Sequence, residues 1–284
     1  MPIIVENLTH IYMKGMPYEK KALDNINLKI DDGEFVAIIG HTGSGKSTLV
    51  QHFNGLLKPT SGRVIIDNID ITTKDLKQLR RNVGMVFQYP EHQLFDETVY
   101  KDISFGLQKM GLSKEEMDRR IHSAASVLGI DDDMLQKSPF ELSGGQKRRV
   151  AIAGVIVMQP KVLIMDEPAA GLDPSGRDEI FNLILNLHKE RNMTIIMISH
   201  DMEEVAKLVD RIIVMNQGRI EMDGKVSEVF KDIERLEKIG LSAPRITYLM
   251  RKLKKKIPYI NDNIYTVEQA KKEILRYIKE NKDA

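Results

Sequence analysis

The 284-residue sequence contains no cysteine. This excludes disulfide bonds and thiolate metal sites, and it is compatible with a reducing cytosol. The formal net charge is only +1, which argues against a protein that coats nucleic acid through general electrostatic attraction. No apolar run approaches the length needed to cross a bilayer, and the first residues lack the basic region and long apolar core of a signal peptide. A membrane role would therefore require a partner protein.

Apolar residues make up 42% of the chain and charged residues 29%, which is ample for a buried core and typical of a soluble protein. The length suggests one large domain or two. Apolar runs at 35–39, 162–165 and 194–198 have the pattern of buried strands. Residues 3–30 are expected to form two antiparallel strands, and 98–154 has a helical pattern. We therefore expect an α/β core with a helical insertion and a helical tail.

Two local signals mark helix starts in the predicted helical parts. Ser113 followed by Glu116, and Thr266 followed by Gln269, fit the capping-box pattern, in which each side chain caps a backbone N–H group of the other residue. In the tail, the basic cluster 251–256 is most simply an exposed helix face, and contact with an anionic lipid or a partner is the alternative.

The clearest chemical signal is segment 40–47, whose sequence fits the phosphate-binding pattern G-x-x-x-x-G-K-[ST]. A buried strand precedes it and a helix follows, so its backbone N–H groups can bind phosphate oxygens at a helix N-terminus. Lys46 can reach the β- and γ-phosphates, and the Ser47 hydroxyl can hold Mg²⁺. The candidate nucleotide-binding residues here are Gly40, His41, Thr42, Gly43, Ser44, Gly45, Lys46, Ser47 and Thr48. The segment predicts binding of a nucleoside triphosphate.

A second signal is the pair of carboxylates that ends the strand at 162–165. Successive side chains of a strand point to opposite faces, so the two groups can do different work. Asp166 can bind Mg²⁺, and Glu167 can orient and deprotonate an attacking water. The sequence therefore predicts hydrolysis as well as binding.

Segment Leu142–Gln146 places a hydroxyl and two glycines before another predicted helix. A helix N-terminus of this kind also suits phosphate. One γ-phosphate cannot be wrapped by two distant loops of one small fold, so this segment predicts a partner chain. The basic residues that follow, Lys147, Arg148 and Arg149, are expected to be solvated helix positions.

Taken together, these motifs resemble the ATPase subunit of an ATP-binding cassette (ABC) transporter. The resemblance covers about 3–229, with the motifs in the family's order. Segment 40–47 matches Walker A, Leu142–Gln146 the signature, and Val162–Glu167 Walker B. The other matches are Gln88 to the Q-loop, Gly171–Asp173 to the D-loop and His200 to the switch histidine.

The resemblance implies an α/β fold with a RecA-like P-loop NTPase core, an antiparallel β subdomain, a helical signature subdomain and a small C-terminal helical region. It places an ABC ATPase domain at 1–232, with the helical subdomain inserted at about 92–155, and a helical extension at 233–284. Two such cassettes dimerise head to tail in the family, so that ATP lies between Walker A of one and the signature of the other.

The family also implies roles for single residues. Glu167, His200 and Gln88 are the implied catalytic residues, and Gln88 also joins Ser47 and Asp166 as a Mg²⁺ ligand. Tyr12 stands where the family has an aromatic residue that stacks on adenine, although Tyr18 in the same loop is a rival. Further nucleotide contacts, across the dimer interface, are implied for Ser143, Gly144, Gly145, Gln146 and Asp173.

Three kinds of ABC ATPase share these motifs: a transporter motor, an ATPase of DNA repair or chromosome structure, and a translation factor. The DNA-repair and chromosome class needs a long coiled coil between Walker A and the signature, and only a compact helical segment fits between Ser47 and Leu142. The translation-factor class carries two cassettes in one chain, whereas this chain has one. A transporter motor is therefore the favoured interpretation.

Within transporters, three segments resemble the energy-coupling factor (ECF) group, which imports vitamins and transition-metal ions. They are Gln88–Phe95, with its Gln-Leu-Phe ending, the Gly-His-Thr-Gly form of Walker A, and 240–247 before the tail. The Walker A form resembles the second of that group's two ATPases. An ordinary ABC transporter subunit remains the alternative. The implied partners are a second ATPase or another copy, a transmembrane coupling subunit and a membrane substrate-binding subunit, with no nucleic acid, at the cytoplasmic face of the membrane.

Overall fold

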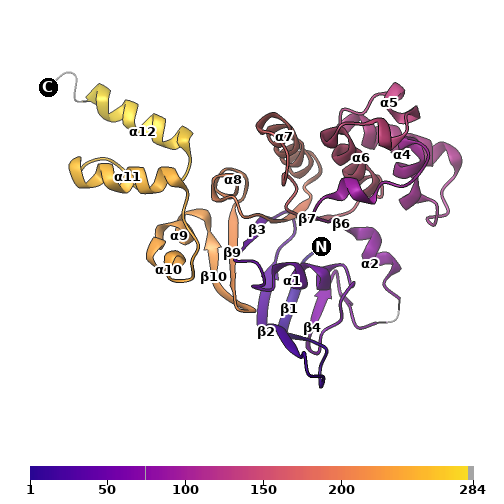
Figure 1. Cartoon of the computed structure of the whole chain (residues 1–284), viewed down its shortest axis with the longest axis horizontal. Coiled ribbons are helices and arrows are strands. Elements are labelled where there is room, and N and C mark those ends of the chain that lie inside the picture. The colour runs from indigo at the N-terminus through magenta and orange to yellow at the C-terminus, as the bar shows by residue number, and fades with distance from the viewer. Residues whose placement is uncertain (74, 281–284) are drawn as a thin grey trace.

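The computed structural model describes residues 1–73 and 75–280. Its centre is a six-stranded sheet of order β10-β9-β3-β8-β7-β6, in which β10 is antiparallel and the other five strands are parallel (Figure 1). The strands are β3 (Phe35–Ile39), β6 (Val83–Val86), β7 (Val162–Asp166), β8 (Thr194–Ile198), β9 (Arg211–Asn216) and β10 (Arg219–Lys225). The buried strands expected at 35–39, 162–165 and 194–198 are therefore confirmed.

The strands of this sheet are apolar at successive positions because both faces of the sheet are buried under other elements. Alternate residues of β3 enter different cores: Phe35 and Ala37 belong to one, and Val36 and Ile38 to the other. Because side chains of a strand alternate between faces, a strand covered on both faces must be apolar at every position.

A second, antiparallel sheet of order β2-β1-β4-β5 shares the core that contains Val36. Its strands are β1 (Ile3–Tyr12), β2 (Lys20–Ile30), β4 (Ser61–Ile66) and β5 (Ile69–Asp70). Helix α1 (Lys46–Phe53) contributes its apolar residues to the same core. The predicted pairing of two antiparallel strands within 3–30 is confirmed.

Between β6 and β7 the chain is helical and forms the group of helices at the upper right of Figure 1. Its α-helices are α3 (Val99–Ser104), α4 (Lys114–Val127), α5 (Asp132–Gln136) and α6 (Gly144–Ile156), and α2 (Lys77–Asn82) precedes β6. The capping box expected at Ser113 is only half correct. The Ser113 hydroxyl accepts from the Glu116 N–H group at 3.2 Å, but the Glu116 carboxylate pairs with Arg119 and Arg120.

After β7, helix α7 (Pro174–Arg191) covers the face of the central sheet opposite the antiparallel sheet. Its residues Ile180, Ile184 and Leu187 belong to the core that contains Phe35. Asp173 caps it and accepts from the Gly176 N–H group at 3.1 Å. Helix α8 (Met202–Leu208) follows β8 and is capped by Asp201. The N-termini of both helices thus lie just beyond strand ends of the central sheet.

The tail consists of α9 (Val226–Lys231), α10 (Ile233–Lys238), α11 (Arg245–Lys256) and α12 (Val267–Glu280). Figure 1 shows α11 and α12 as a pair at the upper left, away from the sheets. The pair has a small core of its own, made of Met250, Ile260, Ile264 and Ala270. The capping box at Thr266 and Gln269 is confirmed in both directions. None of the described helices is long and apolar enough to cross a membrane.

Candidate nucleotide-binding site

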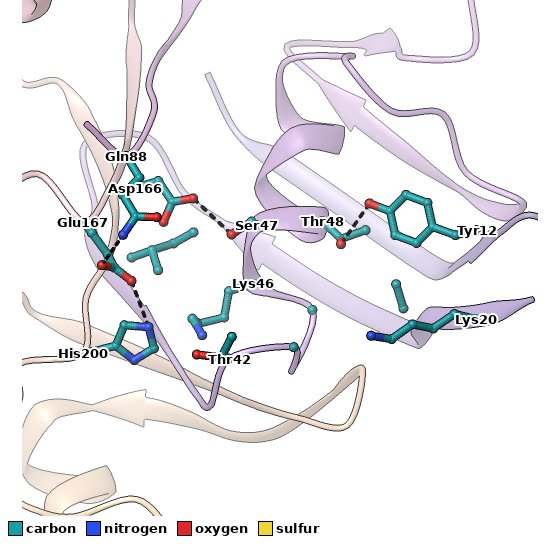
Figure 2. Close-up of a pocket in the computed structure, with 14 residues that line it drawn as sticks. Tyr12, Lys20, Thr42, Lys46, Ser47, Thr48, Gln88, Asp166, Glu167 and His200 are labelled. Carbon is teal, nitrogen blue, oxygen red and sulfur yellow. Dashed lines mark hydrogen bonds and ion pairs between the residues drawn. The ribbon is translucent and has the colours of Figure 1, made fainter. Parts of the chain in front are cut away.

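A cavity of about 430 Å³ lies where four parallel strands of the central sheet end. Loops after β3, β6, β7 and β8 line it, together with the ends of β1 and β2 (Figure 2). The carboxyl edge of a parallel sheet is where α/β proteins bind ligands. The lining residues are Tyr12, Lys20, Ala22, Thr42, Gly43, Gly45, Lys46, Ser47, Thr48, Gln88, Asp166, Glu167, Ile198 and His200.

The phosphate-loop segment after β3 has a backbone that only glycine can adopt at two positions. Gly40 and Gly45 have φ of 150° and 105°, and a Cβ atom on them would lie 2.2 Å from the Met215 carbonyl oxygen and 2.7 Å from that of Ala22. Near them the Ser44 Oγ is buried and has no hydrogen-bond partner among the described residues. A buried hydroxyl without a partner is costly unless a ligand satisfies it, so this loop fits an anionic ligand.

Lys46 begins α1 and is buried against the same loop. Its Nζ donates to the carbonyl oxygens of Gly40 at 2.6 Å and His41 at 2.9 Å. Burial lowers the pKa of Lys46, against the opposing effect of the Asp166 and Glu167 carboxylates. The ammonium group is thus held inside the loop with neutral partners, and a phosphate would supply the anion that it lacks.

Ser47 and Asp166 meet across the cavity, with the Ser47 hydroxyl donating to Asp166 Oδ2 at 3.0 Å (Figure 2). Burial raises the pKa of the Asp166 carboxyl, and the nearby Glu167 raises it further, whereas Ser47 and Lys46 act in the opposite direction. A hydroxyl and a carboxylate oxygen side by side are the hard ligands that Mg²⁺ prefers. The pair therefore fits a Mg²⁺ ion that would take its other ligands from water and phosphate.

The carboxylate of Glu167 is held between the other two implied catalytic residues. Gln88 Nε2 donates to Glu167 Oε2 at 2.9 Å, and His200 Nε2 lies 2.9 Å from Glu167 Oε1 (Figure 2). Glu167 has a left-handed backbone with φ of 52°, and its N–H group donates to the Ile198 carbonyl at 3.0 Å. Non-glycine residues in this conformation cost about 1–3 kcal/mol and cluster at functional sites.

Tyr12 closes the opposite end of the cavity. Its hydroxyl lies 3.2 Å from Thr48 Oγ1, and the residue is 38% exposed. The rival Tyr18 is 82% exposed and lies outside the cavity lining. Behind Tyr12 stand two histidine rings, since His10 packs edge-on against Tyr12 at 4.6 Å and against His52 at 4.9 Å between ring centroids. These packed rings support the Tyr12 ring that faces the cavity, and no local sequence pattern indicates them.

The buried His52 makes stability depend on pH. Burial lowers the pKa of His52 to about 4, with the neighbouring His10 adding to the effect, so protonation in the unfolded chain opposes folding as the pH falls from about 6.5 toward 4. We expect the free energy of unfolding to fall between pH 6.5 and pH 5 in both the wild-type chain and His52→Gln. The fall should be about 1–2 kcal/mol larger in the wild-type chain. Urea unfolding of both proteins at the two pH values measures this. Equal losses would contradict it.

The other candidate residues lie away from the cavity. Ser143 caps α6 in a reciprocal capping box with Gln146, and Gly144 and Gly145 face open space. The Asp173 carboxylate caps α7. The side chain of His41, expected at the phosphates, turns outward to the Ile239 carbonyl at 2.8 Å.

The expectation that Arg148 is solvated is wrong. Its side chain is 1% exposed and forms a bidentate pair with Glu91 at 2.7 and 3.1 Å. The same guanidinium donates to the carbonyl oxygens of Pro168 at 3.1 Å and Ala170 at 2.7 Å. The burial of Arg148 could have been predicted from the sequence, because residues 148, 152 and 156 lie on one face of α6 and the latter two are buried isoleucines. At this position the helical spacing is a better guide to burial than the charge of the side chain.

A model of the ABC transporter family matches residues 23–170. The curated protein "Energy-coupling factor transporter ATP-binding protein EcfA2" of Acetivibrio thermocellus is 64% identical over 279 residues, which cover 98% of this chain and 99% of the relative. The protein of the same name from Clostridium tetani is 61% identical over 279 residues, which cover 97% of each.

Two solved structures are similar over most of the chain. The structure of cbiO1 from Clostridium perfringens, part of the ABC transporter complex cbiONQ, has a TM-score of 0.74 at 46% identity and covers 88% of this chain and 98% of that one. The dimeric cassette MJ0796 in a post-hydrolysis state, bound to ADP and Pi, has a TM-score of 0.70 at 32% identity and covers 79% of this chain and 98% of that one. The α/β cassette fold expected from the sequence is thereby confirmed.

Proposed function

The chain belongs to the ABC transporter family, and we propose that it is the ATP-hydrolysing motor subunit of an energy-coupling factor importer for a vitamin or a transition-metal ion. One observation supports the ATPase chemistry above all: a single cavity holds the phosphate loop, the Ser47–Asp166 pair and the cluster around Glu167. The names of the full-length relatives support the transporter group.

In the proposed reaction, the loop N–H groups and Lys46 bind the β- and γ-phosphates. Glu167 accepts a proton from the water that attacks the γ-phosphorus, and the bond to the β–γ bridging oxygen breaks. His200 donates toward the γ-phosphate, and the ring of Tyr12 stacks on adenine. Ser47, Asp166 and Gln88 would hold Mg²⁺, which neutralises phosphate charge when bound.

The signature segment requires a second cassette in this proposal. Ser143 and Gly145 lie at an exposed helix N-terminus away from the cavity of their own chain, so they are free to contact ATP bound by a partner. The partner would be a paralogous ATPase or another copy of this chain. ATP stabilises the closed dimer, and hydrolysis lets it reopen.

Contact with the membrane subunit is proposed for the segment between Gln88 and Phe95. The rings of Phe95 and Phe105 are both exposed and pack edge to face, with centroids 5.2 Å apart. Exposed aromatic pairs suit the apolar face of a docking helix. This would place the chain at the cytoplasmic face of the membrane. We propose residues 1–232 as the ATPase domain, with the insertion at about 92–155, and 233–284 as the helical extension.

The proposal is tested by co-expressing this chain with the transmembrane and second ATPase genes encoded beside it, and purifying through a tag on this chain alone. A membrane complex whose ATPase activity depends on Glu167 is the expected result, and its substrate-binding subunit would reveal the cargo. An isolated chain, or one purified with ribosomes or DNA, would contradict the transport role. A complex without a separate membrane substrate-binding subunit would favour an ordinary ABC transporter.

Replacing Lys46 by alanine is expected to weaken ATP binding by about 10–100-fold, because charge-assisted hydrogen bonds contribute about 1.5–3 kcal/mol. Lys20 lines the same cavity near Tyr12, so Lys20→Ala is the matched control and should change affinity much less. Titration with a fluorescent ATP analogue measures both variants. Unchanged affinity in Lys46→Ala would refute the proposed phosphate site.

A further inference from the structure

The phosphate loop is tied to the C-terminal extension through His41. His41 Nε2 lies 2.8 Å from the carbonyl oxygen of Ile239, the C-cap residue that directly follows α10. The last carbonyl groups of a helix have no N–H partner inside the helix. With its proton on Nε2, the His41 ring therefore donates to a group that needs an outside donor.

The turn after α10 is shaped to receive this ring. Gly240 has φ of +73°, and a Cβ atom there would lie 2.7 Å from His41 Nε2. The N–H groups of Gly240 and Leu241 donate back to Glu237 and Leu236, each at 2.9 Å, which closes the helix end. Ring and turn are thus packed against each other, beside a cavity of about 370 Å³ that the loop and Lys238 line.

Residues 239–245 form the linker between α10 and α11, and the end of this linker opposite Ile239 is bonded close to His200 in the sequence. The N–H group of Arg245, the first residue of α11, donates to Glu203 Oε1 at 3.0 Å. Glu203 lies in the first turn of α8, three residues after His200. Linker 239–245 therefore contacts the phosphate loop through His41 and the first turn of α8 through Glu203, and α11 and α12 follow it in the chain.

We propose, on the basis of the proposed ATP site, that His41 is a positioning residue that couples nucleotide binding to the C-terminal helices. When Lys46 turns to phosphate, the His41 carbonyl loses the lysine donor that it has in this structure, and the ring's bond to Ile239 holds the loop from outside. The contact thus keeps the loop in its phosphate-binding shape. Coupling is reciprocal, so ATP in turn holds linker 239–245 in place.

The proposal predicts two changes in His41→Ala. ATP affinity falls about two- to tenfold, the range expected for one exposed hydrogen bond. We expect ATP to slow hydrogen exchange of the linker amides in the wild-type chain, and we expect this protection to be lost in His41→Ala. His41→Gln restores both properties, because its side-chain amide can donate in place of Nε2. Lys238→Ala is the matched control in the same cavity and keeps the wild-type response.

The experiment uses the full chain, with hydrogen exchange read by mass spectrometry and affinity by titration with and without ATP. The proposal is overturned if His41→Ala keeps ATP-dependent protection of 239–245, if its affinity rises or stays unchanged, or if His41→Gln fails to restore it. Lys46→Ala distinguishes failure of the proposed ATP site from failure of the coupling through His41. If Lys46→Ala loses ATP while His41→Ala responds like the wild-type chain, the ATP site stands and only the coupling fails.

Discussion

Replacing Glu167 by glutamine is expected to leave ATP bound and to lower the rate of ATP hydrolysis by about 10²–10⁴-fold, the usual contribution of a general base. The substitution keeps the size of the side chain and one oxygen that can accept from Gln88. It removes the group that can take a proton from water. Since Glu167 lies at 2.9 Å from both Gln88 and His200, the variant side chain should stay in the same place, and the loss reports on the missing base.

The measurement is ATP turnover by the purified transporter complex, with ATP affinity determined separately. Glu179→Gln on the exposed side of α7 makes the same chemical change outside the site and should retain wild-type turnover. ATP trapped in a stable closed dimer would agree with the base assignment. Turnover of Glu167→Gln at the wild-type rate would assign the proton acceptor to another group.

The parts of the site that could be predicted from the sequence are those whose functional residues lie within one short segment. Segment 40–47 contains its own turn glycines, its lysine and the start of its helix, so a short pattern specifies the structure. Asp166 and Glu167 follow a strand that is apolar at every position, which places them at the edge of a covered parallel sheet. Parallel strands share one carboxyl edge, so the order of elements brings these segments together.

The parts that could not be predicted depend on contacts between distant segments. No local pattern shows that the His41 ring leaves the phosphate loop for Ile239, because that contact exists only once the tail folds back. The ring packing behind Tyr12 joins a strand residue to His52 in α1. The spacing of α6 predicts that Arg148 is buried, but it does not predict which residue pairs with the charge. That partner is Glu91, which lies 57 residues earlier in the sequence.

Arg148 bonds to two segments near the candidate site and itself lies in a third. It projects from α6, pairs with Glu91, which lies three residues after Gln88, and donates to the carbonyl oxygens of Pro168 and Ala170 in the loop after β7. Burial alone would raise the pKa of Glu91, but hydrogen bonding to Arg148 holds the pKa of that carboxyl below its usual value. One guanidinium therefore bonds the segment after β6 and the segment after β7 to helix α6.

We accordingly expect Arg148→Met to lower the free energy of unfolding by about 3–5 kcal/mol, because it leaves the largely buried Glu91 carboxylate, whose side chain is 15% exposed, without its partner and two carbonyl groups without this donor. Adding Glu91→Gln should recover part of this loss, since the unpaired charge is its largest component. Arg149→Met is the matched control, because the described partner of that arginine is the exposed Glu179 at 3.5 Å, and it should cost less than about 1 kcal/mol. Urea unfolding of the four proteins measures these differences. If Arg148→Met and Arg149→Met cost the same, the guanidinium does not hold the three segments together.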